Sequence, residues 1–223
     1  MNFKKSHIII AIDGPSGTGK STTAKIIAKD LNLTYLDTGA MYRAITFAAL
    51  EEGITPDDKI GMDQLLKSTR IRFDEKNQIL INGILREKEI RGKEVSQMVS
   101  PYSAIPEVRS VLTEWQREIG NEQSCILDGR DIGTVVFPNA DFKFFLITDL
   151  KVRAQRRFLE CQEKGIEMSL EDIEKNLTER DRIDSSRATA PLRKADDAVE
   201  IDTTQLSIQE QVKKIEDRVS VVA

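Results

Sequence analysis

The sequence predicts an α/β fold in which helices flank a parallel sheet, with a small antiparallel insertion and a helical lid. Residues 7–13 form a continuous apolar run, which is typical of a strand buried on both faces. A glycine-rich loop follows, and beyond it apolar residues recur with helical spacing at Ala24, Ile27 and Leu31. Strand, loop and helix therefore follow one another in the order that α/β proteins use.

Later segments continue the same alternation. Apolar runs predict strands at 124–128, 142–147 and 199–201, and we expect a five-stranded sheet in all. Further helices are predicted, with their expected positions at 40–52, from Pro106 onward, at 150–163, at about 169–182 and after Ser207. Ser207 and Glu210 form a capping box that opens the last of these helices.

The segment 61–99 differs from the rest of the chain. It holds three short β-like runs at 71–73, 79–81 and 84–85, and Asn82-Gly83 between the last two is a hairpin signal. We predict a small antiparallel insertion here. The expected division of the chain is a core at 1–60 and 100–223, with a lid at about 150–190, and a separate insertion at 61–99.

Composition limits the possible partners. Thirty-three basic and 37 acidic side chains give a net charge of −4 over 223 residues, which does not favour binding to long nucleic acid polymers. No apolar run is long enough for a signal peptide or a membrane span, so we expect a cytoplasmic protein, without membrane contact. Cys125 and Cys161 are expected to be buried small hydrophobes, and we expect a monomer.

A phosphate-binding loop is the strongest chemical signal. The pattern G-x-x-x-x-G-K-[ST] is matched by Gly14, Pro15, Ser16, Gly17, Thr18, Gly19, Lys20 and Ser21. Glycines let the backbone curl until several N–H groups point at phosphate oxygens. Lys20 supplies a charge for the β- and γ-phosphates, and the Ser21 hydroxyl can bind Mg²⁺. The chain is therefore predicted to use ATP, with Mg²⁺, for phosphoryl transfer.

An acidic residue at the end of a neighbouring strand is the second part of such a site. Asp128 ends the predicted strand at 124–128, and we predict that it lies near the Mg²⁺ shell, directly or through water. Taken alone, this signal is equally compatible with an ordinary helix or loop cap.

Arginines crowd the second half of a chain that is acidic overall. They are Arg130, Arg153, Arg156, Arg157, Arg180, Arg182, Arg187 and Arg193. Guanidinium groups clamp the phosphates between which a phosphoryl group passes, so this cluster favours transfer to a second phosphate. For the three arginines at 153–157 a solvated helix face is an equally good interpretation. Arg180 and Arg187 flank Asp184 in a polar stretch that suits a lid.

Five segments together resemble the bacterial-type cytidylate kinases, within the nucleoside monophosphate kinases. They are IDGPSGTGKST at 12–22, LDTGAMYR at 36–43, LDGRDIGTVVFPNA at 127–140, ERDRIDSSRATAPL at 179–192 and IDTTQLSI at 201–208. The resemblance covers essentially the whole chain. It implies that the core at 1–60 and 100–223 is a P-loop kinase core and that the insertion at 61–99 is its nucleotide-monophosphate-binding piece. It implies the fold of P-loop nucleotide hydrolases and kinases, and transfer of the ATP γ-phosphate to CMP or dCMP, giving ADP and CDP or dCDP.

The resemblance also implies roles for individual residues. It extends the ATP site to Thr22 and Arg157 and makes Lys20, Arg130, Arg180 and Arg187 catalytic. The acceptor is expected at Thr38, Arg43, Ser100, Arg109, Arg130, Asp131, Arg180, Asp184 and Arg187. Of these, Arg43 and Arg130 bind its phosphate near Thr38, while Ser100, Arg109 and Asp131 read its base. Asp184 and Arg187 contact its sugar. Asp131 can accept from the cytosine amino group, whereas a uracil carbonyl would meet a second acceptor there.

The sequence departs from the family pattern at two positions. Thr38 stands where serine is frequent, and Ile183 stands where a charged residue is frequent, which thins the charge network of the lid. No zinc cluster is expected in the lid.

Two alternative functions remain. The alternative enzymes are a uridylate or an adenylate kinase. A GTPase switch is disfavoured because the nearest guanine-reading stretch, at 193–196, begins with Arg instead of Asn or Thr.

Overall fold

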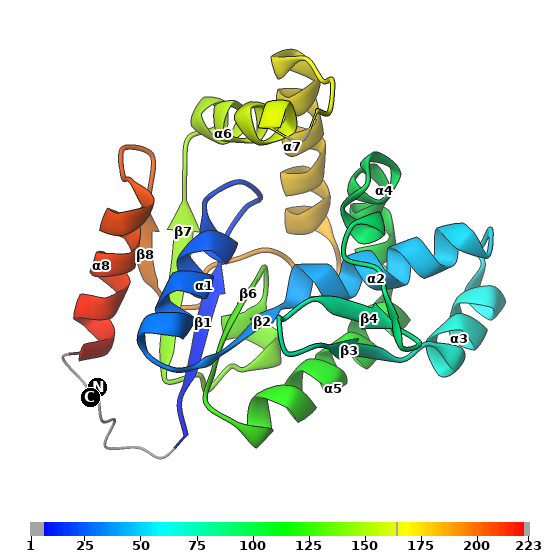
Figure 1. Ribbon diagram of the computed structural model, residues 1–223, viewed down its shortest axis with the longest axis horizontal. Coiled ribbons are helices and arrows are strands. Elements are labelled where there is room, and N and C mark those ends of the chain that lie inside the picture. Colours follow the sequence, from blue (N-terminus) through cyan, green and yellow to red (C-terminus); the bar gives the residue numbers. More distant parts are fainter. Residues whose placement is uncertain (1–6, 164, 221–223) are drawn as a thin grey trace. The chain divides into compact units, whose positions relative to one another are not determined.

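The computed structural model describes residues 7–163 and 165–220 (Figure 1). The chain forms two compact units. Unit 1 comprises Met1–Tyr35 and Gly120–Ala223, and unit 2 comprises Leu36–Ile119. Residues 1–6, for which no leader peptide is expected, lie outside the described part of the chain.

A five-stranded sheet forms the centre of unit 1, in the order β2-β6-β1-β7-β8. Its strands are β1 (Ile9–Asp13), β2 (Thr34–Asp37), β6 (Cys125–Gly129), β7 (Phe142–Ile147) and β8 (Val199–Asp202). β1 pairs in parallel with β6 on one side and with β7 on the other, and all five of its residues are buried. The predicted five-stranded parallel sheet is confirmed. The sequence pattern located every strand of it except β2.

Two helices cover one face of this sheet. α1 (Lys20–Asp30) and α8 (Ile208–Ser220) place Ile27, Val212 and Ile215 in one apolar core with the strand residues Ile10 and Ile12. Burial of such side chains contributes about 1.5–3 kcal/mol each. The capping box before α8 is present, because Ser207 Oγ accepts from the Glu210 N–H and a Glu210 carboxylate oxygen accepts from the Ser207 N–H.

A pair of helices, α6 (Leu150–Glu163) and α7 (Leu170–Ser186), occupies the segment predicted to be the lid. They share a small apolar core made by Ala154, Cys161, Ile173 and Leu177. The sequence pattern ended the second helix near residue 182. In the structure it continues to Ser186, since the Arg187 N–H donates to the Ile183 carbonyl and the buried Asp184 is held by ion pairs.

Unit 2 contains helices and a small antiparallel sheet. Its elements are α2 (Thr38–Glu51), α3 (Lys59–Ser68), β3 (Ile71–Phe73), β4 (Ile79–Ile81), β5 (Ile84–Leu85), the 3₁₀-helix η1 (Glu89–Arg91), α4 (Lys93–Ser103) and α5 (Pro106–Glu122). The predicted hairpin is confirmed, and both turn residues, Asn82 and Gly83, have positive φ angles as a type I′ turn requires. The packing of Ala44, Ile79 and Ile90 fixes the sheet to α2.

The boundaries of unit 2 are wider than those of the insertion expected at 61–99. Helices α2 and α4 and most of α5 also belong to this unit. The insertion was predicted from its three short β-like runs, and helical segments give no such signal. That 61–99 is the nucleotide-monophosphate-binding piece stays a prediction.

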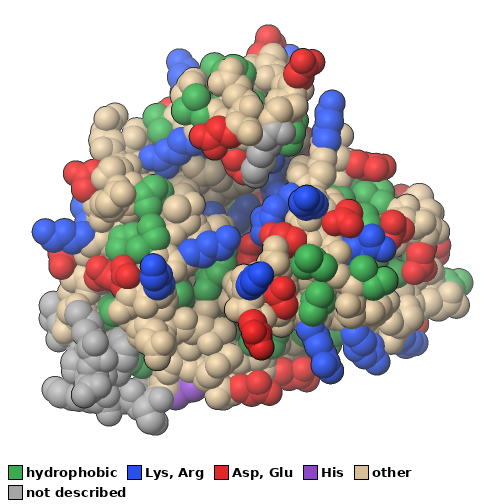
Figure 2. Space-filling view, in the orientation of Figure 1, with side chains coloured by type: hydrophobic (Ala, Val, Ile, Leu, Met, Phe, Trp, Pro, Cys, Tyr) green, Lys and Arg blue, Asp and Glu red, His purple; other side chains and the backbone are tan. Residues whose placement is uncertain are grey.

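Both cysteines are buried, as predicted, and burial raises the pKa of the Cys125 thiol to about 12. On the face shown in Figure 2, acidic and basic side chains are interspersed and apolar side chains form small separate groups. Over the described ranges, the helices are all too short or too polar to cross a membrane.

Candidate functional site

The glycine loop connects β1 to α1 in unit 1, and its backbone requires glycine. Gly14 has a φ angle of 143°, and a Cβ at this position would overlap the backbone carbonyl of Leu146 on β7. Gly19, with φ of 92°, is the N-cap of α1, and an added Cβ would lie 2.8 Å from Gln211 Oε1. The loop therefore opens directly into the N-terminus of α1, the geometry that binds phosphate.

Lys20 lies within this loop and is only 5% exposed. Its ammonium group donates to the Pro15 carbonyl and to Thr18 Oγ1, the latter at 3.2 Å. Burial, together with the nearby positive charge of Arg130, holds the Lys20 pKa well below its usual range. An anion bound in the loop would therefore stabilise the charged form of Lys20.

Ser21 and Asp128 meet, as the sequence predicts. The Ser21 hydroxyl donates to Asp128 Oδ2 at 2.7 Å, and the Tyr35 hydroxyl donates to Asp128 Oδ1 at 2.7 Å. A hydroxyl beside a carboxylate is the hard oxygen chemistry that Mg²⁺ accepts, usually with waters and phosphate oxygens completing the shell. Among the described residues, no group of three or more His, Cys, Asp or Glu side chains could hold a metal ion.

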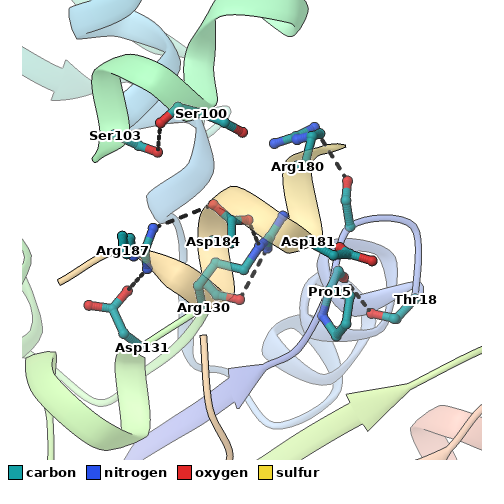
Figure 3. A network of polar contacts seen from close by, with 12 residues as sticks. Pro15, Thr18, Ser100, Ser103, Arg130, Asp131, Arg180, Asp181, Asp184 and Arg187 are labelled. Atoms are coloured by element: carbon teal, nitrogen blue, oxygen red, sulfur yellow. Dashed lines mark hydrogen bonds and ion pairs between the residues drawn. The ribbon is translucent and has the colours of Figure 1, made fainter. Parts of the chain in front are cut away.

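Arg130, Asp131, Asp184 and Arg187 form one polar network in unit 1 (Figure 3). Arg130 Nε donates to Asp184 Oδ2 at 2.9 Å, and Arg187 extends one nitrogen toward Asp184 and another toward Asp131, each at 3.5 Å. Burial alone would raise the Asp184 pKa, but Arg130, Arg180 and Arg187 together lower it below its ordinary value. The structure thus brings together four residues that the sequence predicted to act on one nucleotide.

Arg180 extends this positive region toward the phosphate loop. Its guanidinium donates to Ser16 Oγ at 3.4 Å, and its Nε has no hydrogen-bond partner among the described residues (Figure 3). Burial, with the nearby charge of Arg130, lowers the Arg180 pKa to about 10. An anion bound nearby would therefore stabilise the charged form of this guanidinium, as it would for Lys20.

Arg153 is buried, so the interpretation as a solvated helix face is wrong for this residue. It donates to the Ser16 carbonyl at 3.1 Å and forms an ion pair of 2.7 Å with Asp181. Arg153 therefore ties both helices of the predicted lid to the phosphate loop. Arg157, expected near ATP, pairs instead with Glu160 of its own helix at 2.7 Å and is one-third exposed. Its contact with ATP stays a prediction, as does that of the exposed Thr22.

Four predicted acceptor residues lie in unit 2. Thr38 is buried in the first turn of α2, and Arg43 on the same helix donates to Ser96 Oγ at 3.0 Å. Arg109 on α5 donates to the Ser103 carbonyl at 3.1 Å, and its guanidinium lies over the Tyr42 ring. The buried Ser100 hydroxyl has no hydrogen-bond partner within the described part of the chain.

Four polar residues that were not predicted as part of the site support the glycine loop, the first turns of α1 and the turn after β6. Thr203 Oγ1 donates to the Thr18 carbonyl at 3.2 Å, and the Thr23 hydroxyl donates to Gln211 Oε1 at 3.1 Å. Asp13 accepts from two backbone N–H groups at the start of the turn 132–136. Asp13 and Thr203 lie in segments already matched to the family, at 12–22 and 201–208, but no local pattern marks the contacts of Asp13 or Gln211.

Comparison with known proteins identifies relatives along nearly the whole chain. The family model described as cytidylate kinase matches residues 10–220. A protein named cytidylate kinase from Clostridioides difficile is 47% identical over 214 residues, covering 96% of this chain and 99% of the relative. One of the same name from Halalkalibacterium halodurans is 48% identical, covering 92% of this chain and 94% of the relative.

Solved structures are similar in fold at low sequence identity. A gluconokinase from Sinorhizobium meliloti matches with a TM-score of 0.50 at 13% identity, over 98% of this chain and 95% of the other. This likeness supports the P-loop kinase type of fold, which the parallel sheet and glycine loop display.

The Asp184→Asn variant tests the charge balance of the network. It removes the carboxylate shared by Arg130 and Arg187, so we expect it to lose about 3–5 kcal/mol of unfolding free energy near neutral pH. The folded state lowers the Asp184 pKa below its ordinary value of 3.8, so this stabilisation is present above that value and is lost as pH falls through the folded pKa. The difference from the parent protein should therefore shrink in acid.

Denaturant unfolding at about pH 7 and about pH 2 measures this difference. The control is Asp63→Asn, because Asp63 forms an exposed ion pair with Lys67. The unfolding free energy of this variant should differ from that of the parent protein by less than about 1 kcal/mol. A loss for Asp184→Asn that is no larger than the control's, or that does not depend on pH, would contradict the assignment.

Proposed function

Because the chain belongs to the cytidylate kinase family, we propose that it transfers the γ-phosphate of ATP to CMP or dCMP, giving ADP and CDP or dCDP. It is a kinase, an enzyme of the phosphotransferase class. The observation that carries the proposal is the positive charge gathered at the glycine loop of unit 1, where Lys20 is buried and the half-buried Arg180 donates to Ser16 Oγ at 3.4 Å.

In the proposed reaction an oxygen of the acceptor phosphate attacks the γ-phosphorus of ATP while the bond from that phosphorus to the β–γ bridging oxygen breaks. Negative charge spreads over the oxygens of the transferred group, so catalysis is mainly positioning and charge stabilisation. The loop N–H groups and Lys20 hold the donor phosphates. Arg130, Arg180 and Arg187 stabilise the charge around the transferred group. The ATP contacts include Thr22 and Arg157.

Mg²⁺ accompanies ATP in this proposal. Ser21 and Asp128 would hold it, directly or through water, and the hydrogen bond between their side chains supports this assignment. When bound, the ion would neutralise charge on the donor phosphates. Tyr35 orients the Asp128 carboxylate by donating to its other oxygen.

The assignment of acceptor contacts follows the family pattern. Arg43 and Arg130, with Thr38 nearby, bind the acceptor phosphate. Three residues are proposed to read the base, and they are Ser100, Arg109 and Asp131. Asp184 and Arg187 contact the sugar, and Arg180 lies close to the nucleotide. A monomeric state and a cytoplasmic location complete the proposal, and neither a nucleic acid polymer nor a membrane is part of it.

A panel of acceptors with ATP and Mg²⁺ tests the proposed function. CMP, dCMP, UMP and AMP are compared by kcat/KM, and CMP or dCMP should be the best substrate. A preference for UMP or AMP would replace the proposal by a uridylate or an adenylate kinase. Preferential binding of GTP without transfer to any monophosphate would indicate a switch protein instead.

The Lys20→Ala variant tests the donor site. Loss of the ammonium group removes the side-chain charge nearest to the donor phosphates, so kcat for CMP phosphorylation should fall by at least about 10²–10³-fold. Formation of ADP in a coupled assay measures it, and circular dichroism checks that the variant folds. Lys29→Ala, at an exposed position in the last turn of the same helix, is the matched control and should keep the parent rate. Unchanged turnover in Lys20→Ala would contradict the assignment.

The Asp131→Ala variant tests the reading of the base. Without the carboxylate that accepts from the cytosine amino group, the ratio of kcat/KM for CMP to that for UMP should fall about tenfold to a hundredfold, or about 1–3 kcal/mol. Steady-state kinetics with both acceptors gives this ratio. Asp57→Ala, which removes an exposed carboxylate, is the control and should leave the ratio unchanged. If Asp131→Ala also leaves it unchanged, Asp131 does not read the base.

A further inference from the structure

Asp13 is a buried carboxylate to which the proposed reaction gives no role. It ends β1, directly before the glycine loop, and is 4% exposed. Its Oδ1 accepts from the Ile132 N–H and its Oδ2 accepts from the Gly133 N–H, both at 2.8 Å. Each oxygen therefore holds one backbone group of a segment that follows a different strand, β6.

The segment held in this way is a single turn of π-helix, η2 (Ile132–Val136). Such turns are frequent at functional sites. The Asp131 carbonyl, immediately before it, accepts from the Val135 N–H at 2.8 Å and from the Val136 N–H at 3.2 Å. Asp13 binds the first two N–H groups of the turn, and the Asp131 carbonyl binds two later ones. The backbone at Asp131 is thereby fixed from both sides.

This backbone carries two side chains of the polar network. Asp131 extends its carboxylate to Arg187, and Arg130, the residue before it, pairs with Asp184 (Figure 3). A shift of the turn at 132–133 would move the backbone of both residues. Positioning errors of about 1 Å in such groups are enough to lower catalysis substantially.

Burial makes this carboxylate unfavourable for stability. It raises the Asp13 pKa from 3.8 to about 7, although the two backbone N–H groups act in the opposite direction. The charged groups that affect it are Asp131, which raises its pKa further, and Lys20, which lowers it. A neutral asparagine has one acceptor oxygen, so its amide nitrogen would face one of the two N–H groups. Only a carboxylate can hold both.

We propose that Asp13 is a positioning residue for the acceptor nucleotide, whose carboxylate fixes the turn at 132–133 and so presets Asp131 to read the base. The inference rests on the proposed CMP kinase function. It extends the acceptor site to a residue of the strand that leads into the donor loop. Asp13 acts through Asp131 and does not touch the substrate.

The test is the Asp13→Asn variant, assayed beside the parent protein with CMP and UMP. The KM for CMP should rise about tenfold, the size expected for a lost hydrogen bond to a charged acceptor, and the CMP-to-UMP ratio of kcat/KM should fall. The KM for ATP should change by less than about twofold. Amide hydrogen exchange at Ile132 or Gly133 should become faster in the variant, a readout that does not depend on activity.

Asp141→Asn is the matched control. Asp141 Oδ2 accepts from the Ile9 N–H at 2.9 Å, so the same substitution removes a carboxylate charge at the other end of the same strand, where the one oxygen of asparagine can still accept. This control should keep the parent KM for CMP and the parent CMP-to-UMP ratio. A loss of preference equal to that of Asp13→Asn would show a general effect of removing a carboxylate beside β1 and would overturn the inference.

Gly133→Ala provides a second variant if Asp13→Asn does not fold. The added Cβ would lie 3.2 Å from Lys143 Cδ and 3.4 Å from Asp13 Oδ2, so either the Lys143 side chain or the turn that Asp13 holds has to shift. It should raise the KM for CMP more than that for ATP. If the parent prefers CMP and neither variant changes that preference, the inference fails. If the parent itself does not prefer CMP, the proposed function fails and the inference with it.

Discussion

The parallel pairing of β1 with β6 is the constraint on which the candidate site of unit 1 depends. Ile12 lies opposite Asp128 and Asp13 lies opposite Gly129, so both strands end at the same edge of the sheet. Ligands of open α/β sheets bind outside the carboxyl ends of their strands. The glycine loop leaves this edge from β1, and the turn that carries Arg130 and Asp131 leaves it from β6. In the proposed function, donor chemistry and acceptor recognition therefore begin from two neighbouring backbone positions.

Local electrostatics decide what this edge can bind, and the net charge of the whole chain does not. The chain has a formal charge of −4, yet Lys20 is buried and Arg180 is half-buried, and each has a pKa lowered by desolvation and by Arg130. Asp184 is the carboxylate that offsets part of this charge, and its own pKa is lowered as a result. Cations placed so close together destabilise one another until an anion arrives. In the proposed function, phosphate binding would relieve this unfavourable repulsion, which is a form of preorganisation.

The sequence predicted those features that depend on short-range patterns. The buried run at β1, the glycine loop, the hairpin at Asn82-Gly83 and the partnership of Ser21 with Asp128 were all predictable, because each rests on a local motif or on strand ends that meet in a parallel sheet. β2 was missed since its four residues are too few to show a period. Arg153 was ambiguous because its helix position fits both a solvated face and a buried ion pair. The contacts of Asp13 and Gln211 join segments more than a hundred residues apart, and nothing in the local sequence encodes such pairings.

Asp13 and Asp184 show why burial of a carboxylate has to be interpreted through its partners. Both side chains are almost inaccessible, but guanidinium groups surround Asp184 and lower its pKa, whereas backbone N–H groups alone leave the Asp13 pKa raised to about 7. The first carboxylate stabilises the fold as an anion. The second opposes folding as an anion, since its charged form is less favourable inside than in water. What Asp13 provides is two acceptors at a fixed separation, which hold the Ile132 and Gly133 amides and with them the direction of the Asp131 side chain. A group that is unfavourable for stability and well defined in geometry is better explained by the precision of the site than by the strength of the fold.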